Sequence, residues 1–145
     1  MSVKLGEIAP DFEAITTQGS LRFHEFLGDQ WGILFSHPAN FTPVCTTELG
    51  AVARPQQQFQ RRNTKVIALS VDLLQDHFRW VEDIEETQDV QLNFPIIADE
   101  DRKIAELYEM IQPGISEKTT VRSVFIIGPD KKVKLTLTYP PSTGR

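Results

Sequence analysis

Cys45 is the only cysteine of the chain, and its local sequence suits a reactive thiol. An apolar run over 31–37 precedes it and predicts a buried strand, which Pro38 ends. Thr42 is then placed to cap a helix whose first residue is Pro43, where a missing N–H costs nothing. We therefore expect Cys45 in the first turn of that helix, among backbone N–H groups that have no partner within the helix. Their partial positive charge favours the thiolate, the nucleophilic form of cysteine.

A structural cysteine is the alternative, because most free cysteines are buried and behave as small hydrophobic side chains. The position at a helix start makes the two interpretations about equally favoured. The surrounding motif decides between them. Pro38, Thr42 and Cys45 form the pattern P-x-x-x-T-x-x-C, which continues as Thr46-Thr47-Glu48.

This pattern resembles the active-site signature of the peroxiredoxins, which are thiol peroxidases built on a thioredoxin-like fold. The longer run 35–50 is similar to their one-cysteine (1-Cys, peroxiredoxin-6-like) branch. Further similar segments lie far from the cysteine, at 6–12, 93–99, 120–125, 128–132 and 139–145, and the resemblance extends over the whole chain. The resemblance implies reduction of hydrogen peroxide and organic hydroperoxides through a Cys45 sulfenic acid, without a cofactor, in antioxidant defence and redox homeostasis.

The resemblance also implies a role for each residue of the motif. Thr42 would hydrogen-bond near the thiolate and the peroxide, Arg122 would stabilise the thiolate and the developing oxyanion, and Pro38 would shield the pocket from water. Each has a plainer alternative: Thr42 as a helix cap, Arg122 as a surface arginine, and Pro38 as the end of a strand.

Three supporting residues complete the expected site. Glu48 lies three residues after Cys45 on the same helix face, where an unpaired carboxylate would disfavour the thiolate. We therefore predict that Glu48 pairs with Arg122 and orients it. The resemblance places His37 close to the cysteine, where it would hold the sulfenic acid, but a histidine that merely ends the strand is equally favoured. Arg145 matches a family arginine near the active site.

With no second cysteine, an external thiol of the glutathione or thioredoxin type must reduce the sulfenic acid. A thiol–disulfide oxidoreductase would need Cys-x-x-Cys, and Thr42 stands at its first position. A redox sensor or holdase oxidised at Cys45 is the non-enzymatic alternative, which turnover distinguishes. A phospholipase element ascribed to some 1-Cys relatives corresponds to 28–32, where Gln30 replaces the serine, although His24 and Asp130 match its other members.

Composition narrows the class of protein. A length of 145 residues fits one domain, and a net charge of −5 argues against a nucleic-acid scaffold. No apolar run approaches the roughly 20 residues that cross a bilayer, and the N-terminus has no signal-peptide pattern. A lone cysteine cannot form an internal disulfide, so we expect a cytoplasmic protein. His24 and His77 lack metal-ligand spacing with other ligands, so we expect no metal.

Periodicity and turn residues predict the order of elements. We expect a hairpin over 12–23, strands over 31–37, 65–72, 95–98, 121–127 and 133–139, and helices over 24–27, 42–62, 74–86 and 101–110. The helix over 42–62 would bend near Gly50 or Pro55, and the helix over 74–86 would turn Phe78, Val81 and Ile84 to the core. This α/β order predicts a thioredoxin-like fold with a central mixed sheet, flanking helices and an N-terminal hairpin.

We interpret residues 1–145 as one thioredoxin-like peroxiredoxin domain. Members of the family continue past the Gly-Arg pair at 144–145 into a closing helix and, in the 1-Cys branch, a further C-terminal domain. We therefore expect a chain truncated before both, with one sheet face left uncovered. The alternation over 133–139 predicts a strand with one buried face. If this strand lies at the sheet edge, its open hydrogen-bonding groups favour a homodimer, as the family resemblance also implies, and an edge strand protected by its lysines is the alternative.

Overall fold

The computed structural model describes residues 3–40, 43–115 and 119–141. Its strands are β1 (Glu13–Thr16), β2 (Gly19–Arg22), β3 (Trp31–Ser36), β4 (Thr64–Ser70), β5 (Ile96–Ala98), β6 (Arg122–Ile127) and β7 (Val133–Tyr139). Its helices are α1 (Phe23–Leu27), α2 (Pro43–Ala53), α3 (Gln56–Arg61), α4 (Leu74–Gln88) and α5 (Lys103–Leu107). None of these helices is both long enough and apolar enough to cross a membrane.

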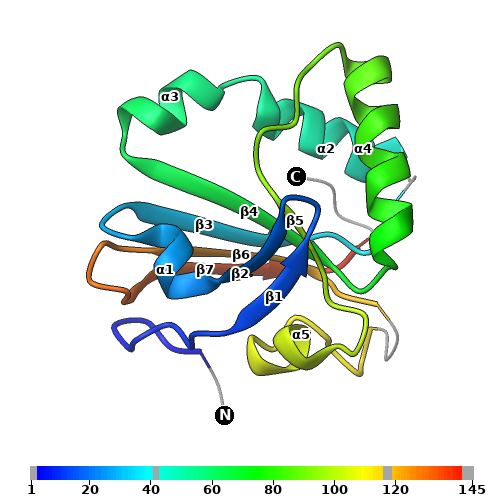
Figure 1. Ribbon diagram of the computed structural model, residues 1–145. Helices are drawn as coiled ribbons and strands as arrows, with labels where there is room; N and C mark the ends of the chain where they lie inside the picture. The colour runs from blue at the N-terminus through cyan, green and yellow to red at the C-terminus, as the bar shows by residue number, and fades with distance from the viewer. Residues whose placement is uncertain (1–2, 41–42, 116–118, 142–145) are drawn as a thin grey trace.

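The strands form one mixed sheet in the order β2-β1-β5-β4-β3-β6-β7. The inner strands β3, β4 and β5 are parallel, as the alternation of strands and helices predicts. β6 runs antiparallel to β3, and β7 pairs antiparallel with β6 at one edge of the sheet. The hairpin β1–β2 joins the other edge through β5. Figure 1 shows α2, α3 and α4 over one face of this sheet, with α1 and α5 on the other side.

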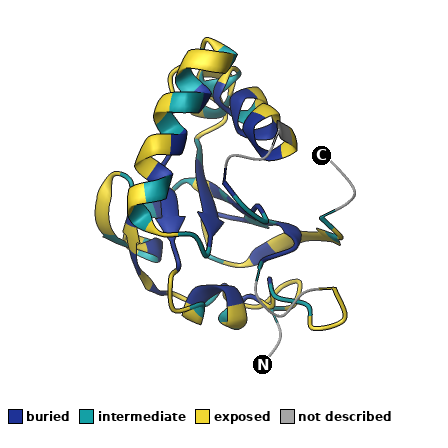
Figure 2. Ribbon diagram, turned by 90° about the vertical axis from the view of Figure 1, so that its right-hand side faces the viewer, coloured by how far each residue is buried: buried dark blue, intermediate teal, exposed yellow. Residues whose placement is uncertain are grey.

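Each face of the sheet carries its own hydrophobic core, because successive strand residues point to opposite sides. Leu34 and Ile67 belong to the core beneath α1 and α5, whereas their neighbours Phe35 and Ala68 belong to the core beneath α2 and α4. Cys45 lies in the second core. Figure 2 shows the buried residues along the central strands and exposed residues on the outward side of the helices.

The helix predicted over 42–62 is two helices. α2 continues through Gly50 without a break, and the Arg54 N–H still donates to the Gly50 carbonyl at 3.1 Å. The chain breaks at Pro55, whose missing N–H ends the α-helical hydrogen bonding, and α3 begins at Gln56. Gly50 instead allows α2 to pack closely against α4, because a Cβ at this position would lie only 2.8 Å from the side chain of Gln88 in α4.

Helix α4 also differs from its prediction in which residues it buries. Its inward residues are His77, Trp80 and Ile84, whereas Phe78 is 47% exposed. The three inward residues follow the i, i+3, i+7 spacing of one helical face. The prediction is therefore wrong for Phe78, whereas Ile84 is buried and Val81 packs against the core as predicted. The polar His77 at the first of those positions made the apolar Phe78 the more obvious core candidate.

β7 lies at the edge of the sheet, but the prediction that it has one buried face is wrong for this chain. Of its apolar residues only Val133 is buried, and Leu135 and Leu137 are 37% and 52% exposed. They lie opposite Ile126 and Val124 of β6, so one side of this edge presents a continuous apolar surface. A hollow of about 360 Å³ next to it is lined by residues of β3, β4, β6, α2 and α3, including Glu48.

Candidate active site

The topology brings Cys45 and Arg122 together from distant parts of the chain. α2 begins after the carboxyl end of β3, and Cys45 lies in its first turn. β6 runs antiparallel to β3 with Val124 opposite Phe35, so Arg122, the first residue of β6, lies at this same end. The guanidinium Nη1 of Arg122 lies 3.5 Å from the Cys45 sulfur, across 77 residues of sequence.

A buried ion pair orients this arginine. Nη1 of Arg122 also donates to Oε1 of Glu48, and the two side chains are only 4% and 6% exposed. Nε of Arg122 donates to the Pro141 carbonyl at 3.0 Å. The Glu48–Arg122 pair predicted from the sequence is therefore present, and the same cation contacts both the carboxylate and the sulfur. A guanidinium held from two sides can present its remaining positive charge at the sulfur in a fixed direction.

The first turn of α2 is tied to α4 beside the cysteine. The Trp80 indole N–H donates to the Thr46 hydroxyl at 2.9 Å, and both residues are buried. Cys45 itself is fully buried, and Leu49 and Trp80 belong to the same core cluster. The sulfur therefore lies in an environment of low polarity, where a nearby cation acts more strongly than in water.

His37 lies at the carboxyl end of β3 and is fully buried. Its backbone N–H donates to the Leu69 carbonyl at 3.0 Å, and its carbonyl accepts from the Thr120 hydroxyl at 2.7 Å. Its ring packs against Trp80 with the ring centroids 4.7 Å apart. His37 therefore contacts Trp80, whose indole N–H holds Thr46 in the first turn of α2.

Two polar residues that the sequence reasoning missed extend from His37 into the core. Nε2 of His37 contacts the Asn40 side-chain oxygen at 2.9 Å, and the Asn40 amide nitrogen contacts Nδ1 of His77 at 2.7 Å. Burial lowers the pKa of His77 below its ordinary value, although nearby carboxylates, led by Asp72, oppose this shift. The spacing of His77 with Trp80 and Ile84 on one helical face was the available signal.

The remaining residues predicted for the site are Pro38, Thr42 and Arg145. Pro38 follows His37 directly and is half-buried at the end of β3. Thr42 and Arg145 lie outside the described residues. The structure therefore brings together Cys45, Glu48 and Arg122, and it places His37 and Pro38 at the same end of the sheet.

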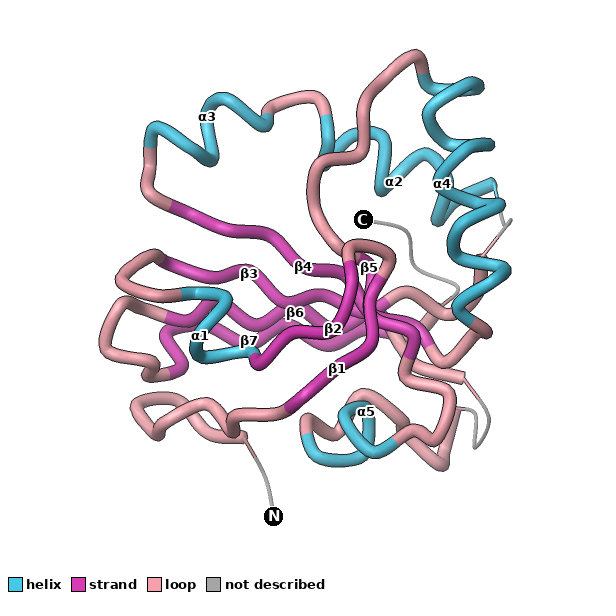
Figure 3. Tube along the Cα trace, in the orientation of Figure 1, coloured by secondary structure: helices cyan, strands magenta, loops and turns pink. Residues whose placement is uncertain are grey.

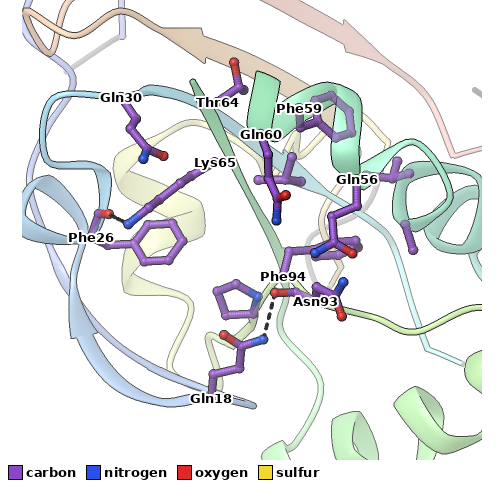
Figure 4. A pocket seen from close by; sticks show the side chains of 14 residues that line it. Gln18, Phe26, Gln30, Gln56, Phe59, Gln60, Thr64, Lys65, Asn93 and Phe94 are labelled. Atoms are coloured by element: carbon purple, nitrogen blue, oxygen red, sulfur yellow. Dashed lines mark hydrogen bonds between the residues drawn. The ribbon is translucent and has the colours of Figure 1, made fainter. Parts of the chain in front are cut away.

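A second pocket lies at the opposite end of the sheet, and Cys45, Glu48 and Arg122 are not among its lining residues. It has a volume of about 320 Å³ and is bordered by the amides of Gln18, Gln30, Gln56 and Gln60. Figure 4 shows these side chains among the lining residues, together with Lys65, whose Nζ donates to the Phe26 carbonyl at 2.6 Å. Gln30 lines this pocket, and it stands where the phospholipase element expected at 28–32 would have its serine. The lining residues that the structure describes include no serine.

The path of the chain separates these two sites. Gln30, just before β3, and Thr64, the first residue of β4, line the amide-lined pocket, and Cys45 lies in the helix that follows the other end of β3. Figure 3 shows the parallel strands β3 and β4 side by side in the sheet. Sites at the carboxyl ends of parallel strands are the usual arrangement in open α/β sheets. The geometry around Cys45 fits that rule, so we take this end of the sheet as the candidate active site.

Comparisons with known proteins agree with the geometry. The family model described as the AhpC/TSA family matches residues 5–136. The chain is 51% identical to a 1-Cys peroxiredoxin of Dictyostelium discoideum over 99% of its length and 59% of the relative's. It is 55% identical to peroxiredoxin-6 of Gallus gallus, with coverage of 97% and 66%. The chain thus spans about three fifths to two thirds of the length of these curated relatives.

Two solved structures give the same result. A mutant of peroxiredoxin 6 of Arenicola marina superposes with a TM-score of 0.93 at 49% identity, over 99% of this chain and 68% of that one. A yeast mitochondrial 1-Cys peroxiredoxin superposes with a TM-score of 0.92 at 46% identity, over 99% and 70%. The chain therefore belongs to the AhpC/TSA family, among the 1-Cys peroxiredoxins, and has their thioredoxin-like fold.

Proposed function

We propose that this chain is a thiol-dependent peroxidase in which Cys45 reduces hydrogen peroxide and organic hydroperoxides. The observation that carries the proposal is the contact at 3.5 Å between the Arg122 guanidinium and the Cys45 sulfur. Cys45 also lies in the first turn of α2, where backbone N–H groups favour negative charge. Together these features stabilise a thiolate, which is the form that attacks a peroxide.

The proposed reaction forms a sulfur–oxygen bond and breaks the O–O bond of the peroxide. The Cys45 thiolate attacks the hydroxyl oxygen of HOOR, and the electron pair of the O–O bond leaves on RO⁻, which takes a proton from solvent. Sulfur is oxidised to the sulfenic acid, and the peroxide is reduced to ROH. In this proposal Arg122 stabilises the charge that passes from sulfur to the leaving oxygen, and its burial and its ion pair with Glu48 support that role.

The other site residues enter this proposal by their resemblance to the family. Thr42 would hydrogen-bond to the sulfur and the peroxide, Pro38 would exclude water, and Arg145 would supply a further positive charge. Support for His37 comes from its position, since it is buried at the end of β3 and packs on Trp80.

An external thiol completes the proposed cycle, since Cys45 is the only cysteine. One thiol displaces water from the sulfenic acid and forms a mixed disulfide. A second thiol attacks that disulfide, releases Cys45 and leaves as part of a disulfide between the two donors. Glutathione or a thioredoxin-type protein is the proposed donor. In the yeast mitochondrial 1-Cys peroxiredoxin of known structure, the thiol is resolved via glutathione and thioredoxin systems.

We further propose that residues 1–145 act as one peroxiredoxin domain of a cytoplasmic homodimer. The edge strand β7 supports dimerisation, because its apolar residues Leu135 and Leu137 are exposed at a free sheet edge. Pairing of two copies would satisfy the edge hydrogen-bonding groups and cover part of that apolar surface.

The test is the second-order rate constant for oxidation of Cys45 by hydrogen peroxide, measured by stopped flow. We expect a rate several orders of magnitude above that of a free thiol, lost in Cys45→Ser and strongly reduced in Arg122→Ala. Arg79→Ala is the matched control, because Arg79 is 74% exposed on α4. A wild-type rate equal to that of a free thiol would refute the proposal. Many turnovers of peroxide per chain with added thiol would exclude a sensor that oxidises only once.

A further inference from the structure

A chain of buried hydrogen bonds connects β5 to His37. Nε2 of His77 lies 3.1 Å from the Ile97 carbonyl, and Nδ1 of the same ring lies 2.7 Å from the Asn40 amide nitrogen. The Asn40 side-chain oxygen lies 2.9 Å from Nε2 of His37. Asn40, His77 and His37 are all buried, so bulk water does not compete for these contacts.

The carbonyl at one end of this chain determines where each proton lies. A carbonyl oxygen can only accept, so Nε2 of His77 must carry a hydrogen. A neutral His77 then has a lone pair on Nδ1, which requires the NH₂ group of Asn40 as its donor. The Asn40 oxygen is left facing His37 and accepts from it, so the hydrogen of His37 is on Nε2.

The neutral state of His77 follows from its surroundings. Its ring is buried between α4 and β5, and burial lowers its pKa more than the neighbouring carboxylates Asp72, Asp76 and Glu100 raise it. Asp72 is itself engaged as the acceptor of the Asn40 backbone N–H at 2.7 Å.

We propose that Asn40 and His77 are positioning residues that hold His37 in its Nε2–H tautomer and keep its Nδ1 a hydrogen-bond acceptor. Nδ1 of His37 is buried as well. The ring packs on Trp80, which holds Thr46 next to Cys45. The Nδ1–H tautomer of His37 would set two lone pairs, or after rotation of the Asn40 amide two N–H groups, against each other in this series of hydrogen bonds. Such a mismatch is unfavourable in the core.

An acceptor at this position has a specific use, which rests on the proposed function. A hydroperoxide and a cysteine sulfenic acid each carry one O–H hydrogen that can be donated. A histidine with its lone pair on Nδ1 can accept that hydrogen bond, whereas the Nδ1–H tautomer would offer a second donor. The tautomer itself does not depend on the proposed function.

Nitrogen NMR of the histidine rings tests the proposal without measuring activity. The chain has only three histidines, so ¹⁵N-histidine labelling gives a small set of ring signals that single His24→Gln and His77→Phe variants assign. We expect the Nε2–H form of His37 to exceed the Nδ1–H form by about tenfold or more at neutral pH. A wild-type His37 in the Nδ1–H form, or as the imidazolium, overturns the proposal and needs no further variant.

Two substitutions of Asn40 separate positioning from simple packing. Asn40→Asp retains an oxygen that accepts from His37, so we expect the His37 tautomer to persist while His77 takes up a second ring proton. Asn40→Leu removes the acceptor, and we expect the two tautomers of His37 to become comparable in population. An unchanged tautomer ratio in Asn40→Leu would show that Asn40 does not control it.

The rate of Cys45 oxidation connects the tautomer to catalysis. We expect Asn40→Leu to lower it about tenfold and Asn40→Asp to remain within about threefold of wild type. A shifted tautomer with an unchanged rate refutes the positioning role. If the wild-type chain shows the expected tautomer but reduces no peroxide, the proposed function fails while the assigned tautomer stands.

Discussion

Replacement of Glu48 separates two opposing effects at the proposed active site. Glu48 shares the Arg122 guanidinium with the Cys45 sulfur, so its carboxylate both orients the arginine and adds negative charge near the thiolate. Loss of orientation would slow oxidation of Cys45, whereas loss of the negative charge would favour the thiolate. We expect orientation to dominate, because Arg122 would lose the carboxylate that holds Nη1 beside the sulfur, whereas its Nε contact to the Pro141 carbonyl would remain.

The structure gives the scale of the effect. Both side chains are under 10% exposed, so solvent screening weakens their interaction little. A hydrogen bond to a charged group contributes about 1.5–3 kcal/mol, against about 0.5–1.5 kcal/mol for a neutral one. Glu48→Gln keeps an acceptor oxygen and loses about 1 kcal/mol, which corresponds to a rate about fivefold lower. Glu48→Ala loses the whole contact, which corresponds to a rate about 10- to 150-fold lower.

The assay is stopped-flow oxidation of Cys45 by hydrogen peroxide, followed by tryptophan fluorescence. Trp80 is a suitable reporter because its indole N–H donates to Thr46, the residue after Cys45. Glu82→Gln is the control for net charge, since Glu82 is exposed on α4. Urea unfolding of the same variants measures stability, and we expect Glu48→Ala to lower the free energy of unfolding by about 3–5 kcal/mol, as for other broken buried pairs.

Two results would refute this reasoning. If Glu48→Gln is faster than wild type, the negative charge of Glu48 outweighs its role in orienting Arg122. If Glu48→Ala leaves both the rate and the free energy of unfolding unchanged, the ion pair contributes to neither the site nor the fold. A rate that falls in the order wild type, Gln, Ala supports the orientation role.

Three further outcomes follow from the geometry. Thr46→Val removes the acceptor of the buried Trp80 N–H, and urea unfolding should show a loss of about 1–3 kcal/mol that Thr87→Val, at an exposed helix position, does not reproduce. Because burial lowers the pKa of His77, the unfolded chain binds a proton at this histidine more readily than the folded chain. The free energy of unfolding should therefore fall as pH drops below about 6.5, by up to about 1.4 kcal/mol per pH unit. The same measurement on His77→Phe should lack this component. Leu137→Lys places a charge on the exposed apolar side of β7, and sedimentation velocity should show at least about tenfold weaker self-association. Thr136→Lys is the control, because Thr136 lies on the other face of β7. Equal weakening by both substitutions would contradict a role for the apolar side.

Local signals in the sequence were sufficient where a contact is set by neighbours in the chain. The apolar run over 31–37 and the pattern from Pro38 to Cys45 correctly predicted a strand followed by a helix that begins at Pro43. The three-residue separation of Cys45 and Glu48 placed both on one helix face, and an unpaired carboxylate there would have been unfavourable. The Glu48–Arg122 pair was therefore predictable, because the strand order also brings the start of β6 to this end of the sheet.

The sequence by itself determined the order of elements, the position of Cys45 at a helix start and the family, because periodicity, turn residues and the motif are local features. Only the tertiary structure decided which residues surround that helix start. Burial of His77 in place of Phe78 depends on how α4 meets the sheet, and the chain from Ile97 through Asn40 to His37 joins three separate segments. Hydrogen-bond partners of this kind follow from the packing of distant elements, which no local pattern specifies.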